Sequence, residues 1–184
     1  MKRSLLNNIN NKKSISIINK IRRDGYCLLE NGVKKENVKK LLRITKSLHN
    51  DNKKINYKGR PDRDSKDLRV YNLPKKNKLY INLISDLNLE IILKKLLNDK
   101  YYRWLPHNLP NYILNSFNAR SSGYELDLHI DSVVPFKGNY PISIIVLFVL
   151  EKMGSENGAT VVVPHSHKSG TYTNRKTNKK KTVS

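Results

Sequence analysis

Apolar positions recur at two different spacings along the chain, and the change comes near residue 111. Before that point they follow the spacing of about 3.6 residues that places side chains on one face of an α-helix. After it they alternate with polar residues or form short apolar runs, as in β-strands. The pattern therefore predicts an α+β protein in which the helices come first and the strands follow.

Three helices are expected in the first part. One covers residues 14–23, with Ser14 as its N-cap and Gly25 just beyond its end. A second covers residues 34–48, and a third begins with Asn88 as its cap. Each has an apolar stripe on one face, which predicts that these helices pack around a common core.

Short strands are expected between the first two helices and throughout the second part. They cover residues 26–30, 112–120, 124–131, 142–150 and 159–163. Asn157-Gly158 precedes the last of them and is a strong signal for a tight hairpin turn. Residues 171–184 are basic and have no apolar periodicity, so we expect a tail without regular structure.

Length and composition indicate one domain over residues 1–170, with a helical part over 1–110 and a β part over 111–170. The apolar run 141–150 has about half of the ~20 residues that a membrane-spanning helix requires, so no membrane partner is expected. Cys27 is the single cysteine of the chain, which indicates a reducing compartment. We therefore expect a cytoplasmic protein.

The net charge of +21 changes this picture less than its size suggests. Clustered Lys and Arg side chains bind phosphate backbones, so a nucleic-acid partner has to be considered. However, lysine, asparagine and isoleucine together fill 65 of the 184 positions, as A/T-biased codon usage would produce. The basic residues are spread along the chain and no zinc-finger or base-stacking motif accompanies them, so nucleic acid is not the favoured partner.

The stretch "LDLHIDS", residues 126–132, contains the strongest candidate for chemistry. On a strand, His129 and Asp131 would point to the same face, with their Cα atoms ~6–7 Å apart. An imidazole and a carboxylate so placed can bind one metal ion and supply two corners of the two-histidine, one-carboxylate site of non-haem iron enzymes. The same spacing also occurs on strands whose polar face meets only solvent.

Several segments, in order, resemble the phytanoyl-CoA dioxygenase family of Fe(II)- and 2-oxoglutarate-dependent oxygenases. They are "INKIRRDGYCLLENGVKKENVKKLL", "LRVYNLPKKNKLYINLI" followed by "LEIILKKLL", "NARSSGYELDLHIDS" and "ENGATVVVPHSHKSG". The resemblance covers residues 17–170. It implies that the helices pack on a double-stranded β-helix, the cupin-like jelly roll.

The resemblance also implies an activity and its cofactors. His129 and Asp131 would bind Fe(II), 2-oxoglutarate would be the co-substrate, and ascorbate is a candidate reductant. The enzyme would hydroxylate a small-molecule or acyl-type substrate, since the retained Asp131 favours hydroxylation over halogenation. Asn118 and Arg120 are candidates for contacting 2-oxoglutarate, with structural hydrogen bonding as the alternative.

Two departures from the family pattern affect this interpretation. His165 stands where the family usually has glycine, and the family's distal histidine and 2-oxoglutarate-binding arginine have no recognisable equivalents. His165 and His167 are the candidates for a third ligand, although local hydrogen bonding explains them as well. We therefore expect the N-terminal part of an oxygenase, with a jelly roll that is incomplete at its C-terminal end and inactive in isolation.

A second class of function fits the same residues. In it the chain is a non-catalytic binding protein that keeps a partial jelly-roll scaffold and uses its basic tail to bind acidic partners. A reading frame that continues past Ser184 with a suitably spaced histidine and arginine would favour the oxygenase, whereas a stop codon there together with salt-dependent binding to nucleic acid would favour the binding protein.

Overall fold

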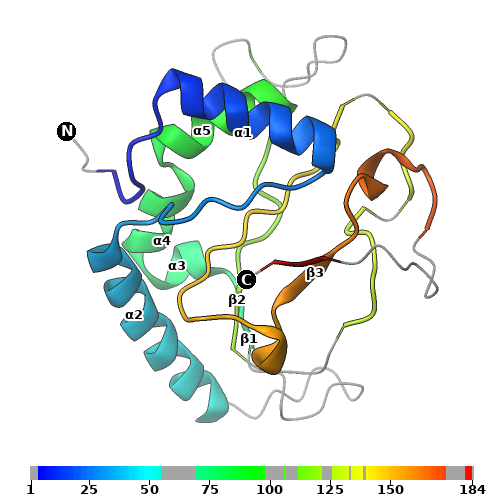
Figure 1. Ribbon diagram of the computed structural model, residues 1–184. Helices are drawn as coiled ribbons and strands as arrows, with labels where there is room; N and C mark the ends of the chain where they lie inside the picture. Colours follow the sequence, from blue (N-terminus) through cyan, green and yellow to red (C-terminus); the bar gives the residue numbers. More distant parts are fainter. Residues whose placement is uncertain are drawn as a thin grey trace.

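The computed structural model of the protein describes residues 4–54, 69–97, 106, 112–121, 126–132, 134–138, 140–172 and 181–183. Within these ranges it combines helices with two small antiparallel sheets, which is compatible with the predicted α+β class (Figure 1). The α-helices are α1 (Asn11–Asp24), α2 (Lys35–Lys54), α3 (Leu73–Lys76), α4 (Lys78–Ile84) and α5 (Leu87–Leu97). The strands and short 3-10 helices are β1 (Arg69–Val70), β2 (Ala119–Arg120), η1 (Ser155–Asn157), β3 (Thr160–Val162), η2 (Ser166–Lys168) and β4 (Lys181–Val183).

Helix α1 is longer at its N-terminus than the sequence pattern predicts. Its N-cap is Asn10, whose side chain accepts a hydrogen bond from the backbone of Lys13. The predicted cap, Ser14, lies inside the helix and is buried. The helix ends as predicted, because Gly25 adopts the left-handed conformation (φ 88°) that favours glycine.

Two apolar clusters hold the helices together. The first joins the N-terminal segment to α2, β1, α3 and α4; its buried members are Leu5, Leu6, Leu41, Val70, Leu73, Tyr80 and Leu83. The second lies between α1 and α5, which pack together in Figure 1, and its buried members are Ile17, Ile18, Ile92 and Leu96. The predicted helical stripes therefore face the core.

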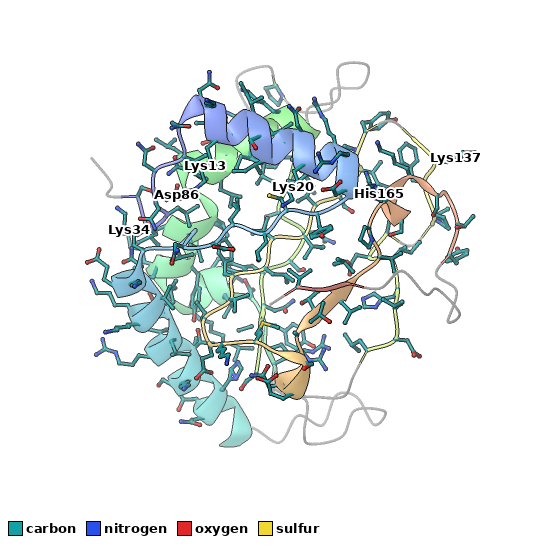
Figure 2. The ribbon with its side chains drawn as sticks, in the orientation of Figure 1. Lys13, Lys20, Lys34, Asp86, Lys137 and His165 are labelled. Carbon is teal, nitrogen blue, oxygen red and sulfur yellow. The ribbon has the colours of Figure 1, made fainter. Side chains whose placement is uncertain are left out.

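Asp86 links the N-terminal segment to α5. Its carboxylate accepts hydrogen bonds from the hydroxyl of Ser4 (2.6 Å) and from the backbone amides of Leu5 (3.0 Å) and Leu6 (3.2 Å). Its other oxygen accepts the backbone amide of Asn88 at 3.0 Å, so Asp86, and not Asn88, is the N-cap of α5. Figure 2 shows Asp86 at this junction.

The strands differ most from the sequence prediction. β1 pairs antiparallel with β2, and β3 pairs antiparallel with β4. Residues 26–30 and 142–150, and the described part of 124–131, contain no strand, so these three expectations are wrong. Asn157-Gly158 forms the end of η1 and not a hairpin between two strands.

The expected tail without regular structure is also wrong for residues 181–183, which form β4; residues 173–180 and 184 lie outside the described residues. The two small sheets do not by themselves establish the jelly roll that the family resemblance implies. No helix in the part of the chain that the structure describes is long and apolar enough to cross a membrane.

Two single residues also differ from expectation. His49 lies at the end of the predicted second helix, where a cation favours the helix dipole, so the sequence predicts a surface position; in the structure His49 is 5% exposed within α2. As a small hydrophobe in the strand expected after the first helix, Cys27 is predicted to be buried. In the structure it is only half-buried against the second cluster, although burial still raises the pKa of its thiol. Its neighbours Leu28 and Leu29 are exposed, because the segment between α1 and α2 covers the core without joining a sheet.

Candidate functional site

His129 and Asp131 lie side by side, although they do not lie on the strand that the sequence pattern predicts. The Nε2 atom of His129 is 3.7 Å from the Oδ1 atom of Asp131. Both side chains are more than half exposed, at 55% and 58%. An ion pair between two such exposed groups adds little to stability, so a stabilising role does not account for the pair.

A backbone contact orients the His129 ring. Its Nδ1 atom lies 2.7 Å from the carbonyl oxygen of Asp127. Because a carbonyl oxygen only accepts hydrogen bonds, Nδ1 carries a hydrogen, and in the neutral ring the lone pair is on Nε2. The nitrogen that faces Asp131 is therefore the one able to bind a metal, and hydrogen bonds of this type orient most metal-binding histidines.

The distance between the two side chains suits a shared cation. Two ligands that bind one ion at right angles, each about 2.1 Å from it, lie ~3.0 Å apart. The observed 3.7 Å exceeds this by less than an ångström. Since both side chains are exposed, they can rotate to close that difference without repacking the core. His129 and Asp131 therefore fit two positions around an Fe(II) ion.

The structure does not gather a third ligand around them. Within the described ranges, no three His, Cys, Asp or Glu side chains come together as a metal site. Asn118 and Arg120, the candidates for contacting 2-oxoglutarate, are both exposed, Asn118 directly before β2 and Arg120 within it. Arg120 lies opposite Arg69 in the β1–β2 pair.

His165 and His167 occupy a different place, beside the end of α1. The Nδ1 atom of His165 is 2.8 Å from the carbonyl oxygen of Arg23, and Nε2 of His167 is 3.2 Å from that of Arg22. The backbone amide of His165 donates to the carbonyl of Asp24 at 2.8 Å. Figure 2 shows His165 at this helix end. The turn after β3 thus satisfies three carbonyls of the last turn of α1, which otherwise lack partners.

Two residues are constrained where this turn meets the end of α1: His165 in its backbone conformation, and Gly25 by the ring packed on it. His165 has a left-handed backbone (φ 66°), the conformation that glycine adopts more readily. The ring of His167 packs on Gly25, where an added Cβ atom would lie 2.5 Å from its Nδ1. Both histidines thus form hydrogen bonds to the end of α1, but these bonds are not local, because the partners lie 142 and 145 positions earlier in the chain.

Sequence reasoning missed one participant, Asp127. The stretch Asp127-Leu128-His129-Ile130-Asp131 places a carboxylate two residues away on each side of the histidine. The spacing alone therefore does not say which aspartate is the partner. In the structure Asp131 faces the ring through its carboxylate, while Asp127 orients the ring through its backbone carbonyl.

Comparisons with known proteins bear on the whole chain. No curated protein and no solved structure is detectably similar to it. A family model described as phytanoyl-CoA dioxygenase (PhyH) matches residues 21–183, which is most of the chain and includes the His129–Asp131 pair. Oxygenases that use Fe(II) and 2-oxoglutarate characterise this family. The chain therefore belongs to the phytanoyl-CoA dioxygenase family.

Proposed function

We propose that the protein is an Fe(II)- and 2-oxoglutarate-dependent hydroxylase whose iron is held by His129 and Asp131. The observation that carries the proposal is their geometry within a family of such oxygenases: Nε2 and Oδ1 lie 3.7 Å apart on one segment. When bound, iron would supply the means of activating dioxygen with electrons from 2-oxoglutarate. The substrate is a small molecule or an acyl compound, as expected from the family.

The chain's own residues have separate tasks at this site. In the neutral ring, the Asp127 carbonyl holds the hydrogen on Nδ1 of His129, which leaves the lone pair on Nε2, the nitrogen that faces Asp131. The Asp131 carboxylate supplies negative charge that offsets the charge of Fe(II). A carboxylate here occupies a position that would otherwise be open to halide, which supports hydroxylation as the reaction.

Asp131, and not Asp127, is the proposed carboxylate ligand. Spacing does not choose between the two aspartates, because each lies two positions from His129. The side chain of Asp131 already faces the ring nitrogen that binds metal. Asp127 therefore provides a control of the same residue type at the same sequence distance from His129.

The test is direct titration of the 184-residue chain with Co(II), a redox-stable substitute for Fe(II), followed by calorimetry and visible absorption. We expect His129→Ala and Asp131→Asn to weaken Co(II) binding at least about tenfold, because even residues that only orient metal ligands cost that much. Asp127→Asn should bind Co(II) like the wild type, since its backbone carbonyl is kept.

Two further variants address the third ligand. His165→Ala and His167→Ala should leave Co(II) affinity unchanged, because both rings bond to the end of α1. A loss of affinity in either would identify it as a ligand. Equal affinities for the wild type, His129→Ala and Asp131→Asn would refute the iron site and favour the non-catalytic binding protein. Succinate formation from 2-oxoglutarate with Fe(II) and ascorbate, compared with His129→Ala, then tests turnover.

A further inference from the structure

Basic side chains gather on the outward face of α2. The sequence distributes lysine and arginine along the whole chain, but the helix brings Lys35, Lys39, Lys40 and Arg43 to the side that is turned away from the core. All four are exposed, whereas Leu41 on the opposite side is 1% exposed. Figure 1 shows α2 along one edge of the molecule. These four residues form the α2 basic stripe.

The positive charge of the stripe is not neutralised within the protein. In the part of the chain that the structure describes, none of the four side chains forms an ion pair or a hydrogen bond. The neighbouring Lys46 differs, because it pairs with Glu151 at 2.6 Å. Glu36 is the single acidic residue between Lys35 and Arg43, and it lies in the first turn of α2. The stripe therefore keeps a net positive charge.

The other strongly basic helix, α1, does not have such a stripe. Arg22 donates a hydrogen bond to the carbonyl of Lys95 at 3.2 Å, and Arg23 pairs with Asp24 at 2.7 Å. Two of the five basic side chains of α1 are thus already engaged within the protein. The outward surface of α1 also exposes an apolar side chain, Ile15, at 46%. The tertiary structure therefore distinguishes α2 as the helix whose basic side chains are available to an anionic partner.

We propose that the α2 basic stripe binds the phosphate backbone of a nucleic acid. At about 1.5 Å per residue, the stripe is ~12 Å long from Lys35 to Arg43. One strand of DNA presents about three to four phosphates over that length, so the four side chains can meet successive phosphates. α2 contains no Phe, Tyr or Trp that could stack on bases, so binding should not depend on base sequence. This surface is separate from the proposed iron site and does not rest on it.

A nucleic acid fits the stripe better than a membrane or an acidic protein does. Helices that lie on membranes insert large apolar side chains into the lipid. Among the described residues, the exposed large apolar side chains include none on α2. Protein surfaces carry both signs of charge, whereas duplex DNA carries one negative charge per ~1.7 Å of its axis. A polyanion of that charge density matches a stripe in which basic residues outnumber the acidic one.

Fluorescence anisotropy of a labelled DNA duplex of arbitrary sequence, titrated with the full chain over a range of salt concentrations, tests the proposal. The test variant replaces Lys35, Lys39 and Lys40 together by Gln. It should bind at least about tenfold more weakly at about 0.1 M salt, and the plot of log affinity against log salt should be less steep by about 3. Glutamine has nearly the helix propensity of lysine, so α2 should be retained.

The matched control replaces three exposed lysines of α1, Lys12, Lys13 and Lys20, by Gln and lowers the net charge by the same amount. It should leave the steepness of the salt dependence nearly unchanged. Equal losses in the two triple variants would mean that net charge alone attracts DNA, and would overturn the proposal. Tighter binding to polyglutamate, or to vesicles of anionic lipid, than to DNA at the same salt concentration would also overturn it.

Two single variants keep the test decisive if the triple variant of α2 does not fold. Glu36→Gln removes the carboxylate that lies within the stripe, so it should tighten DNA binding. Arg43→Gln removes one phosphate contact, so it should weaken binding and make the salt dependence less steep by about 1. Wild-type affinity in both variants would show that DNA does not contact α2.

Discussion

Asp86 provides the sharpest test of how the helical part is held together. Its carboxylate accepts hydrogen bonds from Ser4, Leu5 and Leu6 on one oxygen and from the backbone of Asn88 on the other. The side chain is 3% exposed, so water does not replace these contacts. Asp86→Ala therefore removes both the attachment of the N-terminal segment and the cap of α5.

The expected loss follows from these contacts. The buried amides of Leu5 and Leu6 each lose a charged acceptor, at about 1.5–3 kcal/mol apiece. Loss of the helix cap adds about 1 kcal/mol. Asp86→Ala should thus lower the free energy of unfolding by about 4 kcal/mol or more, and the Tm by roughly 8–16 °C for a chain of this size. Asp86→Asn keeps an oxygen for the cap, so it should lose about 1 kcal/mol less.

The effect should also depend on pH. Burial alone would raise the pKa of Asp86, but hydrogen bonds from Ser4, Leu6 and Asn88 outweigh burial and lower it below the usual 3.8. A lowered pKa in the folded state means that the carboxylate stabilises the fold above the unfolded value, and that this contribution disappears as the pH falls through the folded value. The stability difference between the wild type and Asp86→Asn should therefore shrink below pH ~3.8.

Urea unfolding followed by circular dichroism at the helical band measures these differences. Glu30→Gln removes a carboxylate from the exposed segment between α1 and α2 and controls for the change in net charge. If Asp86→Asn and Glu30→Gln unfold at the same urea concentration, the hydrogen bonds at Asp86 do not hold the N-terminal segment, and the reasoning is refuted.

Two further predictions concern other contacts of the fold. Gly25→Ala should destabilise the protein more than Gly158→Ala, because both have positive φ (88° and 83°) but only at Gly25 would the new Cβ meet the His167 ring. In calorimetric unfolding, Gly158→Ala should cost about 1 kcal/mol, and the two should become equal in a His167→Ala background. Thr45→Val should cost about 1–3 kcal/mol because it leaves the buried hydroxyl of Tyr80 without its 2.8 Å partner. Adding Tyr80→Phe should recover part of that loss in chemical denaturation, and strictly additive losses would contradict the contact.

The helices and the candidate site could be predicted from the sequence because their signals are local. The spacing of Ile17, Ile18 and Ile21 places them on one face of α1 whatever surrounds it, and Gly25 ends that helix by its own backbone preference. His129 and Asp131 come together because they are only two positions apart, although the described part of 124–131 forms no strand. These features require no knowledge of distant residues.

The choice of N-cap for α5 and the roles of His165 and His167 depend on partners that lie far away in the sequence. Asp86 and Asn88 are equally good caps by residue type, and the amides of Leu5 and Leu6 decide between them. His165 and His167 resemble candidate ligands until the fold brings them to the end of α1, more than 140 positions earlier.

The strands were the least predictable part for the same reason. A strand exists only where a partner strand supplies hydrogen bonds, and alternation along 142–150 specifies a face but not a partner. Only three-dimensional packing decided that β3 pairs with residues 181–183 and that 142–150 pairs with nothing the structure describes. Local spacing thus determined which residues share a face in this protein, and tertiary contacts determined what each face meets.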